Sequence, residues 1–153
     1  MSVDAKLQAF SAVLPPPAKP AGVYKPVVVV GNLVYTSGHG PLCFDGTWLK
    51  GRVGAEVDQA AGYQAARQTG LSILSSVKAH LGSLDRIKRV IKTLGMVNAA
   101  PDFENHPAVI NGCSDLFREL WGEDHGVGAR SAVGMGSLPN NIITEIEVIF
   151  ELV

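Results

Sequence analysis

The sequence predicts an α+β fold in which one β-sheet carries two helices on one face. Three observations lead to this prediction: two β-rich runs around a Gly-Asn turn, two long segments with apolar residues at helical spacing, and a C-terminal segment in which apolar and acidic residues alternate. The chain has 153 residues, of which 46% are hydrophobic and 18% charged. This length and composition predict one compact domain over residues 1–153.

Residues 1–21 are predicted to form an N-terminal helix followed by a proline-rich leader. Apolar residues such as Val3, Leu7 and Phe10 recur at roughly helical spacing and predict a short amphipathic helix over residues 3–13. Four prolines follow within a few residues, and each fixes φ and lacks a backbone N–H. We therefore expect the leader to follow an extended path along the surface, like a strap.

The next segments predict a β-hairpin and the first long helix. Residues 27–30 and 33–37 are β-rich and flank the Gly-Asn turn, which predicts the hairpin. A second turn precedes a short strand that we expect near residues 48–50. From Glu56 onward, apolar residues recur at intervals of three and four, which predicts a helix of about 25 residues that Gly82 terminates.

The second half of the chain predicts three more strands and a second helix. Residues 86–97 are rich in β-branched residues and predict one long strand. An apolar stripe that begins at Val109 predicts an amphipathic helix, with Asn111 on its polar face. Strands are also predicted over residues 130–135 and 144–152, and we expect these two to pair in an antiparallel arrangement across a Leu-Pro turn.

The predicted sheet has one face that the helices leave uncovered. The last strand places its apolar residues on one face and Glu145, Glu147 and Glu151 on the other. We expect the uncovered face to carry many apolar and small residues, among them Ala132 and Gly134. A face of this kind typically packs against another subunit.

Charge, cysteine content and hydropathy exclude several classes of function. The 13 Lys and Arg residues balance 14 Asp and Glu residues, so the chain lacks the basic field of a nucleic-acid-binding protein and we expect no nucleic-acid partner. Cys43 and Cys113 form no CxxC motif, which predicts a reducing, cytoplasmic setting. The N-terminus has no secretory pattern, and the longest apolar runs are far shorter than the ~20 residues of a membrane helix. We therefore expect no membrane partner.

The residues that remain as candidates for chemistry are Arg130 and Glu145. The chain has no phosphate loop, no HExxH, no Gly-x-Ser-x-Gly and only scattered histidines, which disfavours a metal site and a serine triad. Antiparallel pairing of the last two strands would bring Arg130 and Glu145 near one end of the sheet. The guanidinium is a fixed fork for a substrate carboxylate, and the carboxylate could polarise a water molecule. The alternative interpretation is a structural ion pair between Arg130 and Glu145 or Glu147.

Several sequence blocks resemble the RidA/YjgF family of reactive-intermediate deaminases. Residues 129–139, ARSAVGMGSLP, and residues 144–147, TEIE, resemble the C-terminal signature of that family. The blocks GVYKP, VYTSG and DF, and then VIN, resemble its remaining blocks in the same order. The resemblance covers about residues 22–153, and the spacing of its Arg-Ser, Leu-Pro and Glu-Ile-Glu elements is specific.

The resemblance implies a chorismate-mutase-like fold assembled as a homotrimer, with three clefts between neighbouring subunits. It implies hydrolysis of enamines and imines to 2-oxo acids and ammonia, without a metal or an organic cofactor. Arg130 matches the family arginine that holds the substrate carboxylate, and Glu145 matches the carboxylate that positions the attacking water. The positions that match residues lining the cleft are Tyr24, Ser37, Gly38 and Asn111.

Two departures from the family pattern place this chain in a divergent branch. The family often has Cys where this chain has Ala132, and Gln where it has His39. The alternative to a hydrolase is therefore a non-catalytic trimer that binds or senses a small carboxylate ligand. Structural roles are also open: Asn111 could brace its own helix, Tyr24 could cover the hairpin, and His39 could serve the local turn.

The chemistry can also be argued from the substrate. A 2-imino acid carries its carboxylate next to an electrophilic carbon, so one cationic fork can anchor it for attack. Addition of water then needs a general base. Glu145 would suit that task if burial raises its pKa towards neutrality.

Overall fold

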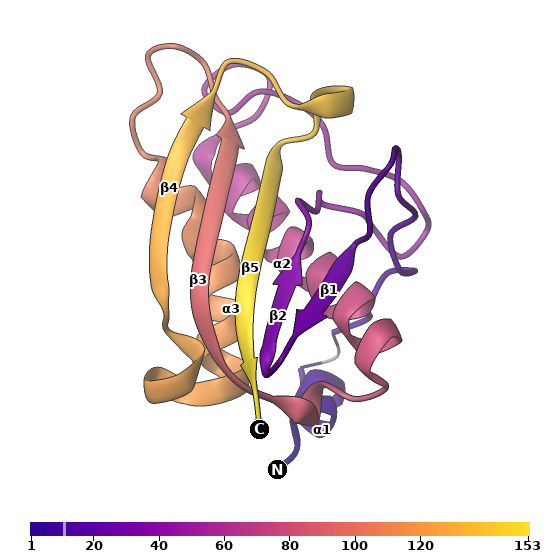
Figure 1. Cartoon of the computed structure of the whole chain (residues 1–153). Helices are drawn as coiled ribbons and strands as arrows, with labels where there is room; N and C mark the ends of the chain where they lie inside the picture. The colour runs from indigo at the N-terminus through magenta and orange to yellow at the C-terminus, as the bar shows by residue number, and fades with distance from the viewer. Residues whose placement is uncertain (11) are drawn as a thin grey trace.

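The structure is a computed structural model that describes residues 1–10 and 12–153. In this part of the chain, five strands form one mixed sheet in the order β1-β2-β5-β3-β4, and two long helices cover one of its faces (Figure 1). The elements are α1 (Val3–Ala9), β1 (Val27–Val30), β2 (Leu33–Thr36), α2 (Gln59–Leu81), β3 (Ile87–Asn98), α3 (His106–Gly126), β4 (Ala129–Met135) and β5 (Thr144–Leu152). The predicted α+β architecture is thus confirmed, with α1 as a third, short helix.

The two long helices end where their sequences indicate. The Asp58 side chain caps α2 by accepting a hydrogen bond from the Ala61 N–H at 2.8 Å. Gly82, with φ +87°, terminates the helix as predicted. α3 has a longer range than the apolar stripe predicted, because one more turn follows the non-helical backbone of Gly122, at φ +79°.

The core lies between the sheet and the two long helices. Side chains at alternate positions of β5 are buried against α2 and α3, as its alternating sequence predicted. A hydrogen bond of 2.8 Å between the Thr69 and Thr144 hydroxyl groups also joins α2 to β5. The largest fully buried side chains include Ile73, Leu74, Leu116, Phe117, Ile146 and Phe150.

The predicted antiparallel pairing of the last two strands is wrong. β3 lies between them, paired with β4 in parallel and with β5 in an antiparallel arrangement. The physical reason is the connection through α3, because a crossover helix lets two successive strands run parallel and side by side, so β4 pairs with β3. The buried Asn98 amide also donates hydrogen bonds to the carbonyl groups of Gly51 and Ile142 at 3.2 and 3.1 Å, and the second of these bonds joins the end of β3 to the chain entering β5.

Two other segments differ from their predictions. Residues 48–50 form no strand and make single bridges instead, Leu42 with Trp48 and Lys50 with Ile142. The N-terminal helix ends at Ala9 rather than at residue 13, and position 11 of the predicted range lies outside the described residues.

The leader follows the surface as predicted. Helix α1 buries Val3 and Leu7, and the Lys6 ammonium group donates to the Leu120 carbonyl at 2.7 Å. Further along, Pro15 is buried and its carbonyl accepts a hydrogen bond of 2.5 Å from the Ser75 hydroxyl on α2. Helix α1 is therefore attached to α3, and the proline-rich leader is attached to α2.

The uncovered face of the sheet is apolar at several exposed positions, but not at those predicted. Ala132 packs against the core, and a Cβ at Gly134 would lie 3.0 Å from the Cδ2 of His106 on α3, so both positions face the helices. The opposite face carries exposed apolar side chains, including Val28, Val30, Tyr35 and Val133. No helix among the described residues has the length and hydropathy needed to span a membrane.

Replacing Gly112 with alanine should destabilise the fold, because the added Cβ would collide with the backbone carbonyl of Tyr63 on α2. It would also lie 3.0 Å from the backbone nitrogen of Arg67. We expect a loss of about 1–3 kcal/mol in the free energy of unfolding, measured by urea denaturation. The matched control is Gly136→Ala, whose Cβ would meet no atom within 4 Å. Equal stability of the two variants would contradict the close approach of α2 and α3.

Candidate functional site

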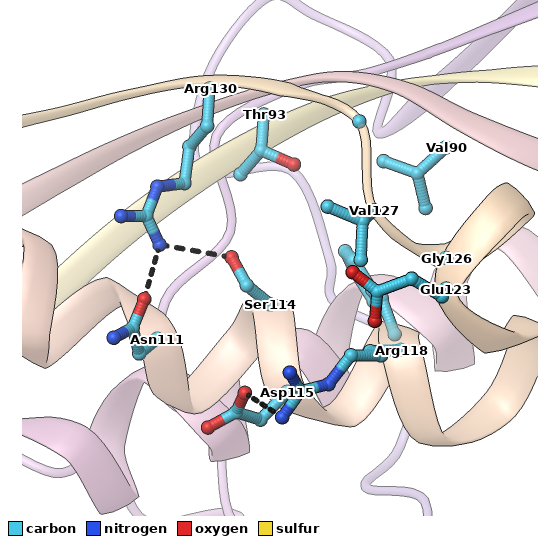
Figure 2. A pocket seen from close by; sticks show the side chains of 12 residues that line it. Val90, Thr93, Asn111, Ser114, Asp115, Arg118, Glu123, Gly126, Val127 and Arg130 are labelled. Atoms are coloured by element: carbon cyan, nitrogen blue, oxygen red, sulfur yellow. Dashed lines mark hydrogen bonds and ion pairs between the residues drawn. The ribbon is translucent and has the colours of Figure 1, made fainter.

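Arg130 lies at the start of β4 and directs its side chain towards α3. Its Nη1 donates hydrogen bonds to the Asn111 Oδ1 at 2.7 Å and to the Ser114 Oγ at 3.2 Å, as Figure 2 shows. These two α3 residues are one turn apart and therefore share the helix face that meets β4. The predicted Asn111 and Arg130 are thus brought together. Ser114 was not predicted as a site residue, although it lies three positions after Asn111 and this spacing places two side chains on the same face of a helix.

The guanidinium of Arg130 has neutral partners. Among the described residues it forms no ion pair with a carboxylate, so the proposed structural pair with Glu145 or Glu147 is absent. The nearby Asp115 carboxylate instead bonds to Arg118 at 2.9 Å and to the Tyr63 hydroxyl at 2.8 Å. Arg130 borders a pocket of about 260 Å³ that the carboxyl groups of Asp115 and Glu123 also line, and among the described residues it pairs with neither, so its guanidinium can bind an anion.

A second pocket, of about 520 Å³, holds the other predicted site residues: Tyr24, Ser37, Gly38 and Glu145. A Cβ at Gly38 would lie 2.9 Å from the Cδ of Glu145, so the carboxyl group packs directly on the glycine backbone. The Tyr24 hydroxyl accepts a hydrogen bond from the Ala21 N–H at 3.0 Å, and the Ser37 hydroxyl donates to the Lys25 carbonyl at 2.6 Å. These contacts hold the pocket wall in shape.

Burial raises the pKa of Glu145, and the negative charge of Glu147 raises it further. A Glu145 pKa raised by burial is the direction that the proposed chemistry required. A carboxylate with a raised pKa is a better proton acceptor than an ordinary surface glutamate, so Glu145 is suited to general-base chemistry.

The two pockets lie on opposite sides of the sheet in one chain. Thr144 and Ile146 are buried towards the helices, so Glu145, between them in the strand, faces the other side. Arg130 faces α3 and pairs across the sheet with Thr93 of β3, which separates β4 from β5. The expected meeting of Arg130 and Glu145 at one sheet end does not occur within a single chain.

His39 has the structural role in its local turn that the sequence allowed, and it also makes a contact with α2 that the sequence did not reveal. Its imidazole is 3% exposed, with Nδ1 2.7 Å from the Ser37 carbonyl and Nε2 2.9 Å from the Ser76 hydroxyl. Burial lowers the pKa of His39, which favours the neutral ring. A neutral ring can donate from Nδ1 and accept at Nε2, so it fastens the wall of the Glu145 pocket to α2.

Within the described residues, no three His, Cys, Asp or Glu side chains gather as metal ligands. The two cysteines are free thiols, with Cys113 buried and Cys43 partly exposed. Burial strongly raises the pKa of the Cys113 thiol, which keeps it protonated and unreactive.

Comparison with known proteins places the whole chain among similar sequences and structures. A family model described as "YjgF/chorismate_mutase-like, putative endoribonuclease" matches residues 4–152. Protein TCP17 of Trypanosoma cruzi is 39% identical over 150 residues, which cover 98% of this chain and 94% of that protein. The solved structure of Atu1372 from Agrobacterium tumefaciens, a protein with unknown function, is 40% identical with a TM-score of 0.90, covering 99% of this chain and 92% of that one.

A further solved structure comes from Shewanella oneidensis and carries an endoribonuclease description. It is 29% identical to this chain with a TM-score of 0.94, and the match covers 99% of this chain and 100% of that one.

Replacing Glu147 with glutamine should lower the pKa of Glu145, because the substitution removes a like charge that opposes its ionisation. Side-chain carboxyl resonances followed by carbon-13 NMR during a pH titration give this pKa directly. Glu151→Gln on the same strand is the control, since Glu151 pairs with Lys88 at 3.4 Å and should leave Glu145 unaffected. A Glu145 pKa that is the same in Glu147→Gln as in the unmodified protein would refute the coupling.

Proposed function

We propose, from the premise that this chain belongs to the YjgF/chorismate-mutase-like family, that it hydrolyses reactive enamine and imine intermediates to 2-oxo acids and ammonia. The resemblance seen in the sequence is confirmed at the level of the family. The observation that carries the proposal is the Arg130 guanidinium, which Asn111 and Ser114 hold in place and which forms no ion pair among the described residues. Such a group is prepared to grip a carboxylate from solution.

The separation of the two half sites supports a reaction cleft between subunits. In a cyclic trimer, one surface of each subunit meets a different surface of its neighbour. The Arg130 pocket of one subunit would then complete the Glu145 pocket of the next. Exposed apolar side chains on the uncovered sheet face, such as Tyr35 and Val133, favour burial in this assembly.

The proposed reaction begins when the substrate carboxylate binds the Arg130 fork. An enamine first tautomerises to the imine, whose protonated form has an electrophilic carbon. Water adds to that carbon while Glu145 accepts one of its protons, and the C=N bond becomes a C–N single bond. The tetrahedral intermediate then collapses: Glu145 returns its proton to the nitrogen and takes the hydroxyl proton as the C–N bond breaks, so ammonia leaves and the oxygen forms the carbonyl group of the 2-oxo acid. The proton on Glu145 then passes to solvent.

The endoribonuclease description of the family defines a competing function. The formal net charge of −1 supplies no basic field to hold an RNA backbone. RNA cleavage that the Arg130→Ala variant loses, with no ammonia release from imines, would replace the hydrolase proposal.

Arg130→Ala should lower kcat/KM for imine hydrolysis by about 10- to 100-fold, because it removes a charge-assisted contact to the substrate carboxylate. Ammonia release from an imine generated in situ by an amino acid oxidase measures the rate. Arg67→Ala is the matched control, since Arg67 lies outside both pockets and is paired with Glu119 at 2.7 Å. Equal rates for Arg130→Ala and the unmodified protein would remove the hydrolase; carboxylate binding without ammonia release would favour the non-catalytic binder.

Co-expression of Arg130→Ala with Glu145→Gln should restore activity, because a cleft can then take Arg130 from one subunit and Glu145 from another. When the two variant subunits assemble at random into rings, about a quarter of the clefts combine an intact Arg130 with an intact Glu145. Co-expression of Arg130→Ala with Asn111→Ala is the control, since both changes fall in the same half site and should give only the mean of the two parents. No recovery in the first mixture would show that the two groups do not act across a subunit boundary.

A further inference from the structure

We infer that the Glu145 pocket contains a subsite for a bulky apolar side chain, so that the substrate is a 2-imino acid larger than a three-carbon or four-carbon one. The inference rests on the proposed function and names its substrate class. The subsite consists of Trp48, Ile142 and Tyr24, together with Ala18 and Ala21 of the leader.

The first wall of the subsite depends on a close approach at Gly40. A Cβ at this position would lie 2.8 Å from the Ile142 Cδ1 and 2.9 Å from the Trp48 Cζ3. Both side chains therefore pack directly on the glycine backbone and stand side by side. Trp48 is bridged to Leu42 through its backbone, while its side chain lines the pocket and the residue remains 38% exposed. An apolar surface is thus fixed in place and open to the pocket.

The second wall comes from the leader. The hydrogen bond from Ser75 to the Pro15 carbonyl ties the start of this segment to α2, and the bond from the Ala21 N–H to the Tyr24 hydroxyl holds its end. Between these two attachments, Ala18 and Ala21 line the pocket with small apolar side chains, and Lys19 lines it as well. The leader therefore forms one side of the subsite.

The pocket has a polar end and an apolar end. Glu145, Ser37 and Gly38 form the polar end, where the proposed reaction takes place. The total volume of about 520 Å³ falls in the range of pockets that bury ligands much larger than pyruvate. A small imine would leave the exposed surface of Trp48 facing water, whereas a branched or aromatic side chain would cover it and gain affinity from the buried apolar area.

Binding can be tested without relying on catalysis, because the chain has only two tryptophans and each gives one indole N–H signal in a nitrogen-15 NMR spectrum. Titration with 4-methyl-2-oxopentanoate, a stable 2-oxo acid with a branched side chain, should shift the Trp48 signal. Trp121, which packs against Phe117 and Phe150, should not respond. Pyruvate should need at least about a 10-fold higher concentration for the same shift. Equal responses to the two acids would overturn the subsite.

Specificity gives the second test. The imine derived from leucine should be hydrolysed with a kcat/KM at least about 10-fold above that of the imine derived from alanine. Trp48→Ala should reduce this ratio towards one, and Gly40→Ala should do the same by displacing Trp48 and Ile142. Phe44→Ala is the control, because Phe44 is an exposed aromatic residue of the neighbouring turn that lies outside the pocket, and the ratio should not change. An unchanged ratio in both Trp48→Ala and Gly40→Ala would refute the inference.

The two proposals fail in different ways. Hydrolysis of both imines with a preference for the one derived from alanine would overturn the subsite and leave the hydrolase standing. A selective Trp48 shift by 4-methyl-2-oxopentanoate, with no ammonia release from either imine, would support the subsite and overturn the hydrolase.

Discussion

The placement of β3 between β4 and β5 is the constraint on which the rest of the structure depends. Because β3 pairs with β4 in parallel and with β5 in an antiparallel arrangement, the last two strands never touch along their length. The Arg130 guanidinium faces α3, and the Glu145 carboxyl group faces the uncovered side of the sheet. One chain therefore presents the two groups on separate surfaces, and the proposed cleft would need a second copy of the chain to bring them together.

Local patterns predicted the helices and the hairpin, but they could not predict the order of the strands. The end of α2 at Gly82 and the alternation of apolar and acidic residues in β5 depend only on residues close together in the sequence. Both can therefore be recognised in a short window of sequence. Consecutive strands usually lie side by side, which made a direct pairing of β4 with β5 the natural expectation. The ladder between β3 and β5 that replaces this pairing joins residues far apart in the sequence, such as Val97 and Thr144, and no local window contains both partners.

The candidate site shows the same difference between features that a short stretch of sequence predicts and contacts between distant residues. Family blocks identified Arg130 and Asn111, and their side chains do meet, at 2.7 Å. The burial of His39 could not be predicted, because its partner Ser76 lies 37 positions away on α2. The packing of Trp48 on Gly40 is likewise a tertiary contact, since the sequence shows a glycine in a turn but not what rests on it. Residue types in motifs were predictable, whereas the surfaces that surround them were not.

In the proposed reaction, the electrostatics of Glu145 would connect substrate binding to water activation. In the chain alone, burial and Glu147 raise the pKa of this carboxyl group. A bare guanidinium brought opposite it by a neighbouring subunit would act the other way, because a positive charge favours the carboxylate form. In the proposed complex, a substrate carboxylate bound to Arg130 would offset that influence, and an apolar side chain against Trp48 would exclude water and strengthen desolvation. The protonated imine would bring its own positive charge beside Glu145 and favour the carboxylate form, so the bound substrate would itself help to set the ionisation state of the group that activates water.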